Sequence, residues 1–183
     1  EKEIDLTEND LVFVTNGSIT ESSTYGDQNT VAILDSSLGG SWSLWQKLSV
    51  QDNAFGKTEK FCGDISKTYF VSATATTLDQ KVPAYIEKIC QRDPFTGKVV
   101  TGGIVSIKES NWLMSWTLNR QPHFKAQPND QLVVWLYGLF PDEKGNYVRK
   151  AMKDCTGEEI AQEWLFHMGV PKDEIRKLAA DSV

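Results

Sequence analysis

Leu113–Asn119 (LMSWTLN) is the segment that most constrains the fold of this chain, because apolar and polar side chains alternate from its second residue onward. On a β-strand, neighbouring side chains point to opposite faces, so Ser115, Thr117 and Asn119 would share one face. The apolar side chains between them would share the other. Such a strand is buried on one side only, and other elements must cover that side.

Other segments supply those elements. Short apolar or β-branched runs predict strands at residues 11–15, 69–76, 103–108 and 131–137, the first of them buried on both faces. Helices are predicted at residues 42–50 with Ser41 as the cap, at 83–92, from the capping box of Thr156 and Glu159 to Met168, and at 171–180. Their buried side chains would be Trp42, Trp45, Leu48, Ile86, Ile89, Cys90, Ile160, Trp164 and Met168. This order predicts an α+β fold, with helices packed against a mixed, largely antiparallel sheet.

Composition narrows the class of protein. With 40% hydrophobic and 24% charged residues, the chain can fill a core, and its net charge of −6 argues against a nucleic-acid partner. No stretch approaches the roughly 20 apolar residues that span a bilayer. Cys62, Cys90 and Cys155 lack metal-ligand and disulfide spacing, so we expect reduced thiols, no metal site and a cytoplasmic protein. Because the chain opens on Glu1 rather than Met, we expect an internal part of a longer protein.

The polar row of the predicted strand is the candidate functional site. Thr117, Asn119 and His123 could offer a hydroxyl, an amide and a ring N–H to one anion. Pro122 restricts the backbone just before the imidazole. The residues alone leave two ordinary alternatives open, which are a solvated strand face and a histidine in a surface loop.

Four long strings carry a resemblance to a known family. Phe13–Gly26, Lys88–Val105, Asn111–Lys150 and Cys155–Pro171 are similar, in this order, to the oleate hydratase family, also called the myosin-cross-reactive antigen family. The resemblance covers nearly the whole chain. It implies a larger bacterial flavoprotein that binds FAD and adds water to the cis double bond of an unsaturated fatty acid, which makes it a hydro-lyase.

The resemblance also assigns roles to residues. A Thr-x-Asn-x-x-x-His pattern that binds the fatty-acid carboxylate in the family matches Thr117, Asn119 and His123. The turn Asn16-Gly17-Ser18 would lie close to the flavin, although an ordinary strand-ending turn is the alternative. The family's catalytic acid would lie upstream of this chain. We therefore expect no catalytic residue here, and no activity or bound FAD in the isolated chain.

The implied organisation has three parts. Residues 1–30 would be a strand and turn returning to the FAD domain, residues 31–150 the fatty-acid-binding domain, and residues 151–183 a C-terminal helical segment. We further expect the full-length protein to form a homodimer and to contact membranes peripherally. Two alternatives from other classes stay open: a non-catalytic module that binds fatty acids or small anions, and an interaction domain with an aromatic partner surface.

Overall fold

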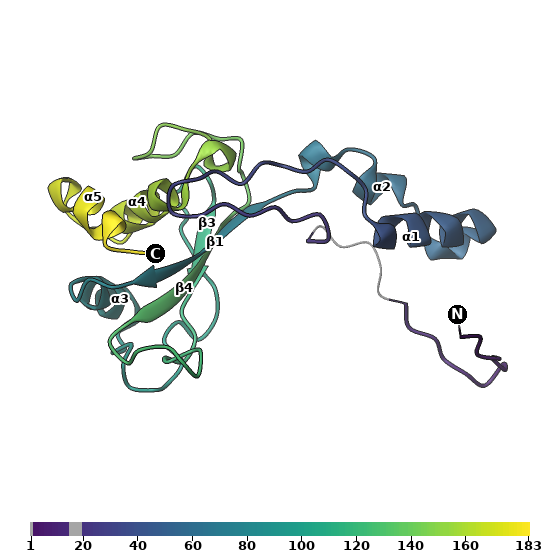
Figure 1. Cartoon of the computed structure of the whole chain (residues 1–183), viewed down its shortest axis with the longest axis horizontal. Coiled ribbons are helices and arrows are strands. Elements are labelled where there is room, and N and C mark those ends of the chain that lie inside the picture. The colour runs from purple at the N-terminus through teal and green to yellow at the C-terminus, as the bar shows by residue number, and fades with distance from the viewer. Residues whose placement is uncertain (1, 15–19) are drawn as a thin grey trace. The chain divides into compact units, whose positions relative to one another are not determined.

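The computed structural model describes residues 2–14 and 20–183 (Figure 1). The chain forms two compact units, each built from two separate stretches. The first unit comprises Glu1–Ser23 and Asp35–Tyr69, and the second comprises Thr24–Leu34 and Phe70–Val183. The chain therefore passes between the units at three places. Each unit is described by itself below.

The second unit is built on a four-stranded antiparallel sheet with the strand order β1-β4-β3-β2. The strands are β1 (Val71–Thr77), β2 (Val105–Ser106), β3 (Met114–Thr117) and β4 (Leu132–Gly138). In the central pair, Trp116 lies opposite Leu136 and Thr117 lies opposite Trp135. The α+β fold with a largely antiparallel sheet is therefore confirmed.

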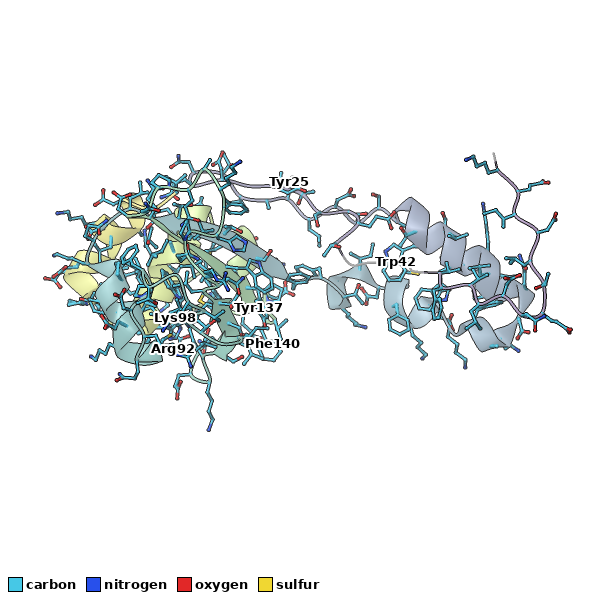
Figure 2. All side chains as sticks on the ribbon, turned by 90° about the horizontal axis from the view of Figure 1, so that it is seen from below. Tyr25, Trp42, Arg92, Lys98, Tyr137 and Phe140 are labelled. Carbon is cyan, nitrogen blue, oxygen red and sulfur yellow. The ribbon has the colours of Figure 1, made fainter. Side chains whose placement is uncertain are left out.

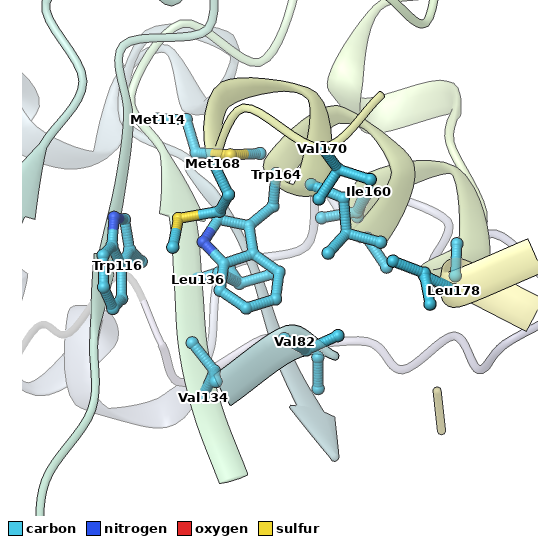
Figure 3. Close-up of a cluster of buried hydrophobic side chains, with 14 of the residues drawn as sticks. Val82, Met114, Trp116, Val134, Leu136, Ile160, Trp164, Met168, Val170 and Leu178 are labelled. Carbon is cyan, nitrogen blue, oxygen red and sulfur yellow. The ribbon is translucent and has the colours of Figure 1, made fainter. Parts of the chain in front are cut away.

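One face of this sheet packs against the hydrophobic core. Met114, Trp116 and Leu118 are at most 1% exposed, as predicted for this face. Ser115 on the opposite face is also buried, at 2% exposed, so burial on one side only is wrong at that residue and holds from Thr117 onward. Helices α3 (Val82–Cys90), α4 (Gly157–His167) and α5 (Lys172–Ala180) supply the other core side chains. Figure 3 shows Trp164 of α4 against the sheet residues, and its ring meets Trp116 edge-on at 5.9 Å between centroids. Such aromatic pairs add about 0.5–1.5 kcal/mol to the gain from burial itself.

The N-terminus of α4 is held from two directions. Thr156 accepts a hydrogen bond from the Glu159 N–H at 3.4 Å, and the Glu159 carboxylate accepts one from the Thr156 N–H at 3.0 Å. This is the predicted capping box. The first two helical N–H groups, of Gly157 and Glu158, donate to the carbonyls of Asp27 and Gln28 at 2.9 and 3.1 Å. A distant stretch of chain thus completes the cap.

A buried carboxylate on α4 organises the loop that follows the sheet. Glu163 is fully buried, and its oxygens accept the N–H groups of Asn146, Tyr147 and Val148 at 2.6, 2.9 and 2.7 Å. His167 Nε2 lies 3.2 Å from the same carboxylate. Burial by itself would raise the pKa of Glu163, but the imidazole and the three N–H donors together outweigh it and hold the pKa below its usual value. The side chain is therefore an ionised clamp on residues 146–148.

The first unit contains two helices, α1 (Gly40–Gln51) and α2 (Glu59–Cys62), and the 3-10 turns η1 (Asn53–Phe55) and η2 (Ile65–Lys67). Trp42 is buried, as predicted, and can be located in Figure 2. It stacks on Trp45 at 5.9 Å, and Trp45 in turn contacts Phe61 at 5.2 Å. The aromatic side of α1 thus faces α2.

Three local predictions are wrong. Ser41 does not cap α1: the N-cap is Gly39, and the Ser41 N–H donates to the Glu21 carboxylate at 2.9 Å, so a distant side chain does the capping. The strand predicted at residues 11–15 is absent over residues 11–14, whose side chains are 51–88% exposed and which pair with no described strand; Thr15 lies outside the described residues. Ile89 is 44% exposed, since α3 ends one residue later, before Gln91 with a positive φ of 54°.

The structure also locates the thiols. Cys62 and Cys155 are buried, Cys90 is half-buried, and all three are free. Among the described residues, no group of three or more His, Cys, Asp or Glu side chains is placed to hold a metal ion. In the same part of the chain, no helix is long and apolar enough to cross a bilayer.

Candidate anion-binding site

Thr117 is the last residue of β3 and lies half-buried on the sheet face opposite the core. Its hydroxyl donates to the carbonyl of Gly103 at 3.2 Å and lies 3.0 Å from the hydroxyl of Thr101. The Thr101 hydroxyl in turn accepts the N–H of Leu118 at 3.3 Å. The side chain is therefore fixed by the segment that pairs with the end of β3.

Asn119 and His123 follow beyond the end of the strand. Leu118 is fully buried and Asn119 is exposed, so the alternation of faces continues for two residues past Thr117. His123 is also exposed, and its ring meets Phe124 edge-on at 4.7 Å. Within the described residues, no hydrogen bond joins the three predicted side chains to one another. The three side chains carry a hydroxyl, an amide NH2 group and a ring N–H.

Two glutamines that the sequence did not single out hold the loop that carries Asn119 and His123. Gln121 is 3% exposed, and its amide oxygen accepts the Val133 N–H at 3.0 Å and the Gln127 side-chain N–H at 2.7 Å. Its amide nitrogen donates to the carbonyl of Asn119 at 3.2 Å. We call Gln121 and Gln127 together the glutamine brace.

The second half of the glutamine brace reaches the histidine. The Gln127 amide oxygen accepts the backbone N–H of His123 at 2.7 Å, and its nitrogen donates to the Gln131 carbonyl at 2.7 Å. The loop is thereby tied to β4 and to itself, across the cis peptide between Gln121 and Pro122. Glutamine side chains are mostly exposed in folded proteins, so composition and periodicity gave no signal that Gln121 is buried and Gln127 half-buried.

An aromatic strip runs beside the polar row. Trp135 lies opposite Thr117 in the register of β3 and β4, and Tyr137 lies opposite Ser115. Residues opposed in this way have Cβ atoms about 4.5–5.5 Å apart. The two rings lie 4.8 Å apart between centroids, Trp135 is 38% exposed, and Tyr137 can be found in Figure 2. The half-buried Thr117 hydroxyl and the exposed Trp135 ring thus lie side by side on one sheet face, whereas Ser115 is buried.

The second predicted site, Asn16-Gly17-Ser18, lies outside the described residues. The arrangement that remains is a set of hydrogen-bond donors next to aromatic rings. This combination suits a ligand with an anionic head and an apolar body, because the head gains hydrogen bonds while the body keeps apolar contacts.

Comparison with known proteins gives the class of protein. The model of the MCRA family matches residues 1–183. The chain is 52% identical over 180 residues to the oleate hydratase of Streptococcus pyogenes serotype M49 (strain NZ131), covering 98% of this chain and 30% of that protein. It is 34% identical over 165 residues to the linoleate hydratase of Lactiplantibacillus plantarum, covering 88% of this chain and 29% of that protein.

The chain belongs to the MCRA family, as the resemblance in its sequence indicates. It spans about 30% of the length of the curated relatives that it matches.

Proposed function

We propose that the full-length protein is an FAD-dependent fatty-acid hydratase and that this chain supplies the grip on the fatty-acid carboxylate. The observation that carries the second part is the sheet face on which Thr117 lies directly opposite Trp135. A fatty acid has a charged head and an apolar tail. The head matches the donors of Thr117, Asn119 and His123, and the tail matches the aromatic strip of Trp135 and Tyr137. The two hydratases among the relatives support the first part.

A remote grip is physically necessary for such a reaction. Taking a carboxylate out of water costs several kcal/mol unless it gains strong hydrogen bonds. Thr117, Asn119 and His123 would supply a hydroxyl, an amide and an imidazole donor. Because the acyl chain is held at its head, the distance from that head selects which carbon atoms meet the reacting groups.

The proposed reaction adds a proton to one carbon of the cis double bond and a hydroxyl from water to the other, with no net redox change. The proton donor and the positioned water belong to other parts of the protein. When bound, FAD would supply structure and electrostatics, with Asn16, Gly17 and Ser18 as its proposed neighbours in this chain. The described residues show no glycine-rich strand-to-helix turn for a dinucleotide, so no step is assigned to the cofactor here.

The test uses the full-length protein and measures oleate binding by calorimetry together with oleate hydration. Thr117→Val and the pair Asn119→Ala plus His123→Ala should each weaken oleate binding about tenfold or more, since each removes bonds to a charged group. Thr74→Val is the matched control, because Thr74 is an exposed hydroxyl residue on β1 that also lies opposite Trp135.

Unchanged oleate affinity in both site variants would refute the proposal that these three side chains are the carboxylate anchor. Binding without hydration in the full-length protein would favour a non-catalytic fatty-acid module instead. We further propose the division into residues 1–30, 31–150 and 151–183, a homodimeric and cytoplasmic full-length protein, and peripheral contact with membranes. Sedimentation and liposome co-pelleting of the full-length protein test the dimer and the membrane contact.

A further inference from the structure

Thr101 is a hydroxyl residue that contacts the proposed anchor directly. It is half-buried on the segment between α3 and β2, and its Oγ1 lies 3.0 Å from Thr117 Oγ1. The Leu118 N–H donates to Thr101 Oγ1 at 3.3 Å, and the Thr101 N–H donates to the Leu118 carbonyl at 3.3 Å. Two main-chain bonds to one residue therefore fix the position of the Thr101 oxygen.

The segment is also held from its other side. Arg92 Nη1 donates to the carbonyl of Val100 at 3.1 Å, one residue before Thr101. Gly102, one residue after, has a positive φ of 68°, and a Cβ there would lie 3.3 Å from the same guanidinium nitrogen. The position of Arg92 can be followed in Figure 2. Thr101 is thus held next to Thr117 by a turn that Arg92 fixes in place.

The hydroxyl protons of Thr101 and Thr117 each have more than one possible acceptor. Each hydroxyl has one proton to donate. The proton of Thr117 is directed at the Gly103 carbonyl at 3.2 Å, and the proton of Thr101 can reach either Thr117 Oγ1 or the Leu118 carbonyl at 3.4 Å. Rotation of the Thr117 hydroxyl about its Cβ–Oγ1 bond turns the proton toward a ligand without moving any heavy atom. Water can then solvate the carbonyl of Gly103, which is exposed.

We propose that Thr101 is a positioning residue of the carboxylate site, which it strengthens by donating to Thr117 while Thr117 donates to the anion. This inference rests on the proposed function. The relay runs from the Leu118 N–H through the Thr101 and Thr117 hydroxyls to the carboxylate. Hydrogen bonds in a chain polarise one another, and a charged acceptor gains most from a polarised donor. Thr101 therefore favours an acid over an uncharged head group.

The test compares two ligands that differ only at the head, oleate and oleyl alcohol, on the full-length protein. Thr101→Val should raise the dissociation constant for oleate by roughly fivefold and that for oleyl alcohol by less than about twofold. Thr101→Ser keeps the hydroxyl and should bind both ligands within about twofold of the unchanged protein. In hydration assays, the Val variant should raise KM and leave kcat nearly unchanged, because a uniform binding interaction is lost.

The chain offers a matched control. Ser106 and Ser115 form a second hydroxyl pair at 2.9 Å, between β2 and β3, that does not involve Thr117. Ser106→Ala should leave the preference for the acid over the alcohol unchanged. Thr101→Ala replaces Thr101→Val if thermal unfolding shows that the Val variant is not folded.

Two results would overturn the inference. Equal weakening of acid and alcohol by Thr101→Val would show a purely structural residue, and unchanged binding of both would show no role at all. Thr117→Val separates these results from failure of the anchor itself. If Thr117→Val weakens oleate binding and Thr101→Val does not change the preference for the acid, the anchor stands and the relay is wrong.

Discussion

Glu163→Gln tests the buried carboxylate that clamps residues 146–148. The substitution keeps the size of the side chain but replaces one oxygen by an NH2 group. One oxygen, Oε2, accepts the N–H groups of Tyr147 and Val148, and the other, Oε1, accepts that of Asn146. The remaining amide oxygen can keep the first two bonds, while the NH2 group faces the Asn146 N–H, donor against donor.

The magnitude follows from this count. One buried N–H loses its acceptor, which costs about 1–3 kcal/mol, and the two retained bonds lose the assistance of the charge. The contact between His167 and an ionised carboxylate, at 3.2 Å, is also lost. We expect Glu163→Gln to lower the free energy of unfolding by about 2–4 kcal/mol.

Urea denaturation of the chain, followed by tryptophan fluorescence, measures the loss, and amide hydrogen exchange locates it. Protection should fall first at Asn146, Tyr147 and Val148. Glu158→Gln is the control, because Glu158 lies on the same helix and, within residues 2–14 and 20–183, its carboxylate accepts a hydrogen bond from a neighbouring side chain alone, that of Gln162 at 3.0 Å. A loss below about 1 kcal/mol, with protection of the three amides unchanged, would refute the clamp.

The remaining predictions concern acid stability, the glutamine brace and a thiol. Because the pKa of Glu163 is lower in the folded chain, its stabilisation is complete above the ordinary glutamate pKa and is lost as the pH falls through the folded value. In Glu163→Gln, the free energy of unfolding should therefore fall less steeply as the pH is lowered. The same acid dependence as in the unchanged chain would contradict this. Gln121→Leu leaves the half-buried Val133 N–H without its acceptor and should cost about 1–2 kcal/mol by urea denaturation; exposed Gln91→Leu is the control. Burial raises the pKa of Cys155 to about 12, so at neutral pH iodoacetamide should alkylate Cys155 far more slowly than a free thiol, as peptide mass spectrometry would show.

Much of the second unit could be predicted because its signals are local. The alternation around Trp116 depends only on the geometry of a strand, and the capping box of α4 depends only on residues three apart. The capping box and the buried apolar face are present as predicted, although Ser115 on the other face is buried as well. The family, too, could be identified from continuous strings of sequence.

The wrong and missing predictions share a physical cause, which is dependence on distant partners. The acceptor for the N–H of Ser41 is Glu21, 20 residues away in sequence. The run at residues 11–14 has strand-forming side chains, but a strand also needs a neighbour, and propensity does not show whether one exists. Gln121 and Gln127 read as ordinary loop residues, since only the folded loop shows that they bond to each other.

The two carbonyls that complete the α4 cap also bear on the order in which the chain can fold. Residues 24–34 leave the ribosome before α5 does, yet the Gln28 side chain bonds to the carbonyl of Ala179, a separation of 151 residues. Contacts so far apart in sequence form slowly, because closing a long loop costs entropy before any bond is gained. During synthesis this stretch cannot complete its docking until α5 has also been made.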